Sequence, residues 1–216
     1  MAFLFASASS QYLIGGSAPV TVEPLTIALW YRVASTPTNR MAFSLGRSTG
    51  QGAFRINITG TTMLAQRVDD TGAPNASSST TVANTVGTWY HAAGVFLGSG
   101  SAVTGYINGV AGTPATNTGT TLSTLDRIVI GARLSAGSPG LYFDGDIAEV
   151  GVWNAALNAD EIAGLAKGFP CRLARPSSLQ FYSRLIRNAM DIRGGIALTN
   201  TNGATVSDHP RIIYPC

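Results

Sequence analysis

The segment from Phe143 to Trp153 constrains the fold more than any other part of the chain, because its alternating pattern predicts a strand that is apolar on both faces. The apolar side chains occupy both parities of the pattern: Phe143, Ile147 and Trp153 on one, and Ala148, Val150 and Val152 on the other. A strand of this kind needs cover on both sides. We therefore expect it in the middle of a layered β-structure.

A short helix is predicted directly after this strand. Asn158 is a favourable N-cap, and Glu161 three residues later completes a capping-box pattern. Ile162 and Leu165 form an apolar stripe, and Gly168 ends the helix. A strand, a tight connection and one small helix are expected to close a β-domain.

The pattern that begins with Gly-Asp-Ile-Ala-Glu-Val at Gly145 and ends with Glu-Ile at Ile162 resembles the final strand and trailing helix of laminin-G-like, concanavalin A-like jelly rolls. The resemblance covers about residues 1–168 and implies an all-β, antiparallel β-sandwich jelly roll with one short helix. It implies the fold more strongly than the function, because this fold carries lectins, glycosidases and structural modules. Further segments match in the expected order: Ser10–Leu13 and Leu25–Tyr31 (opening strands), Gly87–Phe96 (central strand) and Tyr106–Gly109 (hairpin).

The rest of the body agrees with this fold class. The chain has 216 residues, enough for one domain with a sizeable core plus an extension, and 12% of its residues are charged against 45% hydrophobic. Asn108 and Gly109 predict a type I′ hairpin turn. Residues 69–85 and 111–125 are predicted as polar loops or edge regions. Alternating runs predict strands at Thr26–Val33, Met41–Gly46, Phe54–Ile58, Met63–Val68, Trp89–Leu97, Val103–Ile107 and Arg127–Ala132.

The composition changes after Gly168, which divides the chain into a laminin-G-like body of residues 1–168 and a C-terminal extension of residues 169–216. The body carries 8 basic and 9 acidic groups, a net charge of −1, whereas the extension carries 6 Arg and 2 Asp, a net charge of +4. The extension is also too apolar for a disordered linker. We expect it either to wrap its own domain or to contact another subunit.

Arginine is the residue that we expect to carry such a contact. The chain has 13 Arg and a single Lys, and arginine is favoured at interfaces because its planar guanidinium pairs bidentately and stacks on aromatic rings. Nucleic acid is a less favoured partner, since the arginines are not interleaved with exposed-looking aromatic residues. The predicted interaction residues are Arg172, Arg175, Arg184, Arg187, Arg193 and Arg211.

Glycoside hydrolysis is the enzyme hypothesis to test, because related glucanases place carboxylates in a similar strand motif. The nearest match is Asp144-x-Asp146-x-x-Glu149. In an unbroken strand Asp146 and Glu149 point to opposite faces, and only a β-bulge between them would align the two carboxylates. Glu149 shares its parity with Ile147 and Trp153, which indicates a partly buried carboxylate held by an arginine or by backbone donors. We predict no catalytic residues and no enzyme activity.

The histidines and cysteines do not form a catalytic or metal-ligand pattern. His91 is expected in the core beside Trp89 and Val95, and His209 at a turn, fixed by Asp208 or a backbone group. Cys171 and Cys216 both lie in the extension and lack a zinc-ligand pattern, so we interpret them as free thiols. A bridge that closes the extension or links subunits through Cys216 is the alternative.

No cofactor is predicted. Calcium is the candidate cofactor to consider, because many members of the resembled family bind it at the rim of a sheet. The candidate carboxylates do not form a dense ligand loop, so we interpret them as turn caps. They are Asp69, Asp70, Asp144 and Asp146.

A carbohydrate site would use exposed aromatic rings and polar loop donors. The aromatic residues that could form such a platform all lie in predicted strands, where packing into the core is the favoured interpretation. They are Trp30, Tyr31, Trp89, Tyr90 and Trp153.

A mostly uncharged jelly roll with an arginine-rich, apolar extension fits a subunit of an assembled particle. The chain has no run of 18 apolar residues, so no membrane span is predicted, and Met1–Ser9 lacks a basic signal-peptide region. Ser177–Tyr182 and Asn202–Ile213 look like the ends of laminin-G-like proteins encoded among tailed-bacteriophage structural genes.

We therefore predict a non-enzymatic virion protein of the capsid-decoration or head-fibre type, assembled in the host cytoplasm as a homo-oligomer. Its extension would dock on other virion subunits, and adhesion to host surface glycans is added to that role. The alternative is a free carbohydrate-binding lectin, and a glycoside hydrolase is third.

Overall fold

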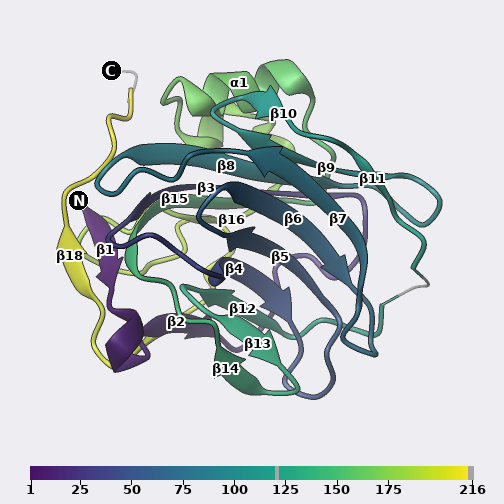
Figure 1. Ribbon diagram of the computed structural model, residues 1–216, viewed down its shortest axis with the longest axis horizontal. Coiled ribbons are helices and arrows are strands. Elements are labelled where there is room, and N and C mark those ends of the chain that lie inside the picture. The colour runs from purple at the N-terminus through teal and green to yellow at the C-terminus, as the bar shows by residue number, and fades with distance from the viewer. Residues whose placement is uncertain (120–121, 214–216) are drawn as a thin grey trace.

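The computed structural model describes residues 1–119 and 122–213 and shows two antiparallel sheets packed face to face (Figure 1). The predicted antiparallel jelly roll with one short helix is confirmed. In sheet A, β11 (Ala115–Thr116) also pairs with β9, and β16 (Leu179–Ser183) pairs with β15. The main order of sheet A is β10 (Val110–Ala111), β9 (Ala102–Ile107), β8 (Trp89–Phe96), β3 (Leu25–Val33), β15 (Gly145–Trp153), β1 (Ala2–Phe5) and β18 (Thr205–Ser207).

Sheet B forms the second layer. A separate small sheet consists of the hairpin formed by β13 (Arg133–Ser135) and β14 (Ser138–Gly140). Residues 69–85, predicted as a loop or an edge region, contain the edge strand β7. The order of sheet B is β17 (Leu198–Thr201), β2 (Tyr12–Gly15), β12 (Arg127–Ile130), β4 (Arg40–Gly46), β5 (Ala53–Ile58), β6 (Thr62–Val68) and β7 (Pro74–Thr81).

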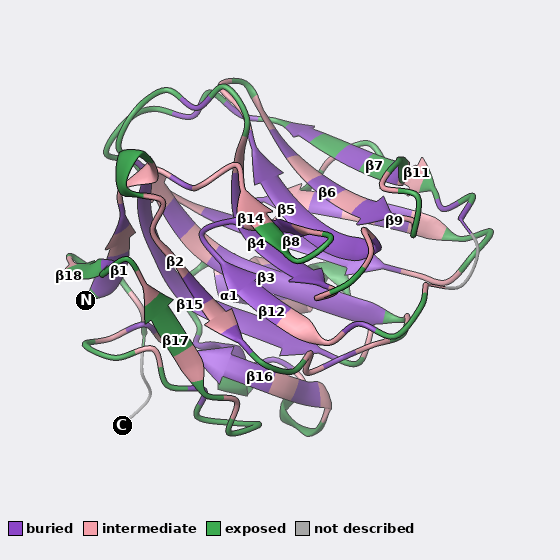
Figure 2. Cartoon of the chain, turned by 90° about the horizontal axis from the view of Figure 1, so that it is seen from below, coloured by how far each residue is buried: buried purple, intermediate pink, exposed green. Residues whose placement is uncertain are grey.

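The main core lies between the two sheets, where alternate residues of each strand point inward. On β3 these are Ile27, Leu29 and Tyr31, and on β5 they include Phe54 and Ile56, all almost fully buried. Figure 2 shows buried positions along the central strands and exposed positions in the loops and on β7 and β17. Burying one such side chain contributes about 1.5–3 kcal/mol. The two-residue period of the strands directs these side chains into the core, and their burial is the main source of stability.

Strand β15 contains a β-bulge that the sequence pattern does not reveal. The register with β3 shifts by one residue between Ala148 and Gly151, and Glu149 has a φ of 53°. The bulge reverses the parity of the following residues. Ile147 therefore lies in the main core while Trp153 lies on the outer face of sheet A, which corrects the prediction that they share a face with Glu149.

The outer face of sheet A carries a second apolar cluster. Trp153 is fully buried there beneath helix α1 (Ala159–Ala166), and its indole Nε1 donates to the carbonyl of Ala174 at 2.8 Å. Ile162 and Leu165 of α1 pack against this cluster, as their spacing predicts. The predicted capping box is confirmed, because the Asn158 side chain accepts from the Glu161 amide and the Glu161 carboxylate accepts from the Asn158 amide.

The extension packs on the body in the part that the structure describes, residues 169–213. It continues from two 3₁₀ turns, Cys171–Leu173 and Pro176–Ser178, into β16, which pairs with β15. Its last strands pair with the first strands of the chain, β17 with β2 and β18 with β1. Figure 1 shows the yellow C-terminal segment beside the purple N-terminal strand. Both sheets therefore include strands from the extension.

The two chain ends also join at a corner of the sandwich. Gln11 Nε2 donates to the carbonyls of Asn202 and Gly203 at 3.1 Å each, and Asn202 Nδ2 donates to the carbonyl of Ser10 at 2.9 Å. These bonds connect the crossing from β1 to β2 with the crossing from β17 to β18. They close this edge of the sandwich.

Candidate functional site

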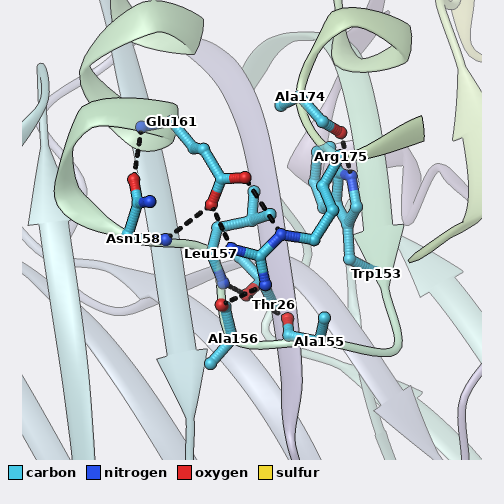
Figure 3. Close-up of polar contacts among 9 residues, drawn as sticks. All are labelled: Thr26, Trp153, Ala155, Ala156, Leu157, Asn158, Glu161, Ala174 and Arg175. Atoms are coloured by element: carbon cyan, nitrogen blue, oxygen red, sulfur yellow. Dashed lines mark hydrogen bonds and ion pairs between the residues drawn. The ribbon is translucent and has the colours of Figure 1, made fainter. Parts of the chain in front are cut away.

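The predicted interaction arginines of the extension fall into two groups. Arg175 forms a bidentate pair with Glu161 at 2.7 and 3.0 Å and also donates to the carbonyl of Ala156 at 2.9 Å (Figure 3). Arg193 donates to the carbonyls of Leu179 and Pro176. Arg175 therefore ties the extension to the body, whereas Arg193 joins two parts of the extension itself.

The other arginines of the extension do not gather at one place in the fold. Arg172 lies on a 3₁₀ turn beside helix α1, and the main chain of Arg184 accepts from the amide of Glu149 at 3.3 Å. Arg172, Arg187 and Arg211 are exposed, and Arg184 is half-buried. Docking of these residues on another subunit stays a prediction.

The β-bulge brings the two hydrolase-like carboxylates to the same outer side of sheet A, but each is engaged within the protein. Asp146 accepts from Arg32 Nε at 2.8 Å and from the hydroxyl of Ser207. Glu149 is buried and accepts from the hydroxyl of Tyr182, and His209 Nε2 lies 3.2 Å from its other oxygen. The expectation that Glu149 is a buried carboxylate held by neighbouring groups agrees with this burial, and its contacts include a tyrosine and a histidine that sequence reasoning did not predict.

The calcium candidates do not form a ligand set. Asp69 and Asp70 lie at the turn between β6 and β7, where Asp69 accepts from Thr71 and Asp70 pairs with Arg47. Hydrogen bonds from Thr71 lower the pKa of Asp69, as expected for a turn cap. Asp144 and Asp146 lie instead at the start of β15. Within residues 1–119 and 122–213, no group of three or more His, Cys, Asp or Glu side chains is placed to hold a metal ion.

The cysteine and histidine predictions have different outcomes. Cys171 is a buried free thiol, its pKa raised by burial and by Glu149, whereas Cys216 lies outside the described residues. His91 is buried as predicted, and burial lowers its pKa to about 3. His209 Nδ1 lies 2.9 Å from the carbonyl of Pro210, so a backbone group contacts it as expected, together with the unpredicted Glu149.

The predicted aromatic residues do not form one platform. Tyr31 and Trp153 are fully buried, and they lie on opposite faces of sheet A. Tyr90 stacks on Tyr31, with ring centroids 5.6 Å apart. Trp30 packs edge-on against His91, and Trp89 lies under the guanidinium of Arg32. Packing into the core is confirmed for Tyr31 and Trp153, whereas Trp30, Trp89 and Tyr90 are half-buried.

The outer face of sheet B carries a polar arrangement that sequence reasoning missed. Ser44 on β4 pairs with Arg55 on β5, Arg55 with Gln66 on β6, and Gln66 with Ser77 on β7. Residues paired in this way share a face, and their neighbours Phe43, Leu45, Phe54 and Ile56 point into the core. We call Ser44, Arg55, Gln66 and Ser77 the polar row.

Hydrogen bonds hold Arg55, Gln66 and Ser77 of the polar row. Gln66 Nε2 donates to Ser77 Oγ at 3.2 Å, and Asn57 Nδ2, one pleat away on β5, donates to Gln66 Oε1 at 3.5 Å. Arg55 Nη2 donates to the carbonyls of Gln51 and Leu134 at 3.3 and 3.2 Å. The side chains are thus held on a rigid sheet rather than on mobile loops.

This face retains hydrogen-bonding atoms that the protein does not use. Ser44 Oγ, Arg55 Nε, Asn57 Oδ1 and Arg133 Nε are all buried and lack a hydrogen-bond partner among the described residues. Buried polar atoms are normally satisfied, and a group of orphaned atoms indicates a site that water or a ligand completes. Gln66 and Arg133 are half-buried and Ser77 is exposed, so solvent reaches the row at these residues, whereas Ser44 and Arg55 are buried.

Two arginines give this face a positive charge. Burial of Arg55 and the nearby Arg133 lower the pKa of Arg55 to about 10, so the Arg55 guanidinium group remains charged at neutral pH. Among the described residues, neither arginine forms a salt bridge with Asp or Glu. Arg133 belongs to β13, and Leu134 beside it packs on Val129 of β12.

Aromatic residues flank the polar row on the same face. Val129, next to Ser44, also pairs with Ile14 on β2, so Tyr12 two residues earlier lies on this side as well. The rings of Tyr12 and Tyr142 have centroids 6.0 Å apart, and both are half-buried. We call Tyr12 and Tyr142 the tyrosine pair. The face therefore combines hydrogen-bonding groups, cationic groups and partly exposed aromatic rings.

The members of this site are far apart in the sequence, and only sheet pairing brings them together. A weak signal was present, because Arg55 and Asn57 interrupt the apolar pattern of β5 at positions that the alternation directs away from the core. That signal shows polar residues on one face of one strand. It does not show which residues of the neighbouring strands lie beside them.

Comparison with known proteins supports the fold. An SAP-like pentraxin from Limulus polyphemus, whose crystal structure is a native heptamer, has a TM-score of 0.72 at 17% identity, covering 96% of this chain and 94% of that one. A putative carbohydrate binding protein from Bacteroides ovatus has a TM-score of 0.62 at 19% identity, covering 99% and 61%. The CBM40 of the Ruminococcus gnavus IT-sialidase, bound to α2,3-sialyllactose, has a TM-score of 0.58 at 16% identity, covering 70% and 91%.

At the level of sequence, no curated protein matches the chain. Residues 7–163 match the sequence profile of the concanavalin A-like lectin/glucanases superfamily, which is most of the chain. No helix in the described part of the chain has the length and apolar character needed to cross a membrane. The predicted relationship is confirmed by the profile match, and the chain belongs to the concanavalin A-like lectin/glucanases superfamily.

Proposed function

We propose that this protein is a non-enzymatic, carbohydrate-binding lectin-like module, and that its glycan site is the outer face of sheet B. The observation that carries the proposal is the gathering of unused hydrogen-bonding atoms on the polar row and its neighbours Asn57 and Arg133. Similar solved structures include a putative carbohydrate binding protein and a sialidase CBM40 bound to sialyllactose, which supports the same class of ligand.

The chemistry of the face suits a sugar. Sugar hydroxyls both donate and accept hydrogen bonds, and the amides of Asn57 and Gln66 and the hydroxyls of Ser44 and Ser77 offer both kinds of group. The apolar face of a sugar ring packs well on an aromatic side chain, which the tyrosine pair supplies. From Ser44 to Ser77 the row crosses three strand spacings of about 4.8 Å, or roughly 14 Å, and its Gln66 and Ser77 end is the more exposed one.

The test is a glycan array followed by calorimetry on the best ligand. Gln66→Ala and Arg133→Ala should each weaken binding about tenfold, because each removes donors worth about 1–1.5 kcal/mol. Arg172→Ala is the matched control for Arg133, since Arg172 is an exposed arginine on the extension. Binding that survives both site variants unchanged, or equal loss in the control, would refute this location.

A second candidate is the predicted virion role, in which the protein docks on neighbouring subunits in an assembled particle. It is favoured by exposed apolar side chains on the extension: Phe169 and Leu173 beside α1, and Met190 and Ile192 in the segment between β16 and β17 are 44–60% exposed. Single apolar residues on a surface are common, but several near one another often mark an interface.

Point variants test this second role better than truncation, because removal of the extension would remove strands from both sheets. Light-scattering mass should show an oligomer for the intact protein and a smaller species for the double variant Met190→Ser, Ile192→Ser. A matched pair of polar changes at exposed valines of the body, Val22→Ser and Val110→Ser, should leave the mass unchanged. A monomer in every case would refute the docking role.

A further inference from the structure

We infer that the glycan bound on the outer face of sheet B is acidic, and that Arg55 and Arg133 bind its carboxylate. The inference rests on the proposed function and specifies the ligand class of the same site. It depends on one comparison within the molecule, namely which arginines already have a carboxylate partner and which do not.

Most arginines of the body are already paired. Arg32 pairs with Asp146, Arg47 with Asp70, Arg67 with Glu23 and Arg127 with Asp126, at 2.8–3.5 Å. Even the fully buried Arg67 follows this rule, since Glu23 lies 3.0 Å from its Nε and Asn75 accepts from its Nη1. Arg67 is therefore a buried arginine that the fold supplies with a carboxylate.

Arg55 departs from this rule. It is only 6% exposed, yet within the described residues its hydrogen-bond partners are two neutral carbonyls and its Nε is orphaned. A buried cation without a counter-ion is unfavourable, and a neighbouring cation increases the cost. Arg133 is that neighbour, close enough for its charge to affect Arg55, and its own Nε is also orphaned. Within the part of the chain that the structure describes, the site therefore has two guanidinium groups and no carboxylate within ion-pair distance of either.

A bound carboxylate would remove both defects. The guanidinium group presents its N–H donors in a planar fork that matches a carboxylate, and such charge-assisted pairs are about twice as strong as neutral hydrogen bonds. Ser44 pairs directly with Arg55, and Gln66 lies on its other side, so neutral groups remain beside the charge for the hydroxyls of the sugar. The arrangement fits an acidic sugar better than a free inorganic anion, which would leave these groups and the tyrosine pair unused.

The experiment compares matched acidic and neutral probes by calorimetry. The probes are 3′-sialyllactose with its methyl ester, trigalacturonic acid with its methyl ester, lactose, and 3′-sulfolactose. We expect at least one free acid to bind about tenfold or more tighter than its ester, and this preference to shrink in high salt, because it comes from charge. Arg133→Ala should abolish the preference and Arg133→Lys should retain part of it. Arg133 is used because it is half-buried on a hairpin, so its variants are expected to fold.

The outcomes separate the two proposals. If esters or lactose bind as tightly as the acids and the face variants weaken them, the proposed function stands and the acidic specificity is wrong. If 3′-sulfolactose binds more tightly than any free acid, the carboxylate assignment is overturned in favour of a sulfated glycan. If neither these probes nor an array of neutral glycans binds, the proposed function is wrong and the inference fails with it.

Discussion

The outer face of sheet A is apolar and covered, whereas the outer face of sheet B is polar and is reached by solvent at Gln66, Ser77 and Arg133. On sheet A, helix α1 and the extension bury Trp153, Ile162 and Leu165, and the carboxylates of Asp146 and Glu149 are engaged inside the protein. On sheet B, the hairpin β13–β14 lies over one part of the face, and the polar row beside it retains unused hydrogen-bonding atoms.

The proposed function assigns stability to one face of the sandwich and recognition to the other. A sheet face that is apolar must be covered, and the cover contributes stability through buried area. A face with orphaned polar atoms contributes less to stability but offers preorganised groups to a ligand. We therefore expect substitutions on the outer face of sheet A to lower stability. Substitutions on the outer face of sheet B should instead weaken binding and have little effect on stability.

Replacing Trp153 should have the largest effect. Trp153→Ala removes a fully buried indole and its bond to the Ala174 carbonyl, and should lower the free energy of unfolding by about 3–5 kcal/mol. Trp153→Phe keeps most of the packing and should cost less. Denaturant unfolding measures both. A loss below about 1 kcal/mol for the alanine variant would show that the cover of sheet A does not unfold together with the sandwich.

Acid should destabilise the protein through His91. Its pKa in the folded state, about 3, lies below the ordinary value of 6.5 because burial disfavours the charged ring. The unfolded chain therefore binds the proton more readily, so stability is full above pH 6.5 and falls as the pH drops toward 3, by at most about 1.4 kcal/mol per pH unit.

The variant His91→Gln isolates this effect from that of the carboxylates. Between pH 6.5 and 4.5 it should lose clearly less stability than the wild type, as measured by thermal or urea unfolding at each pH. Parallel curves for the two proteins would mean that His91 does not cause the acid sensitivity.

The Arg175 contact should have a moderate effect. Arg175→Ala removes the bidentate pair with Glu161 and the bond to the Ala156 carbonyl, which are partly exposed, and should cost about 1 kcal/mol. Arg172→Ala, at an exposed arginine nearby, should cost less than about 0.5 kcal/mol. If the two variants are equally stable, the contact in Figure 3 does not help to hold the extension.

Replacing Ser44 should have the smallest effect on stability, and whether the change stabilises or destabilises the protein is informative. Its hydroxyl is buried without a partner among the described residues, so Ser44→Ala should leave the protein equally stable or more stable by up to about 1 kcal/mol while it weakens glycan binding. Ser183 on sheet A is the matched control, because its hydroxyl is buried and orphaned in the same way. Ser183→Ala should stabilise similarly without affecting binding. A loss of binding in both variants would contradict the division between the faces.

Local patterns in the sequence determined the elements of this protein. The alternation of residues 143–153 predicted a central strand, and the spacing of Asn158, Glu161 and Gly168 predicted the capped helix that follows it. Both predictions hold because they depend on side-chain period and on hydrogen bonds between residues close in the chain.

Tertiary structure alone decided how those elements combine. The bulge at Glu149 moved Trp153 to the opposite face from Ile147, and the pairing of β4 to β7 aligned Ser44, Arg55 and Gln66 into one row. The course of the extension through both sheets was likewise decided by pairing with β1, β2 and β15. The physical reason is that strand register depends on hydrogen bonds between residues distant in the chain, and a shift of one residue reverses the face of every side chain that follows.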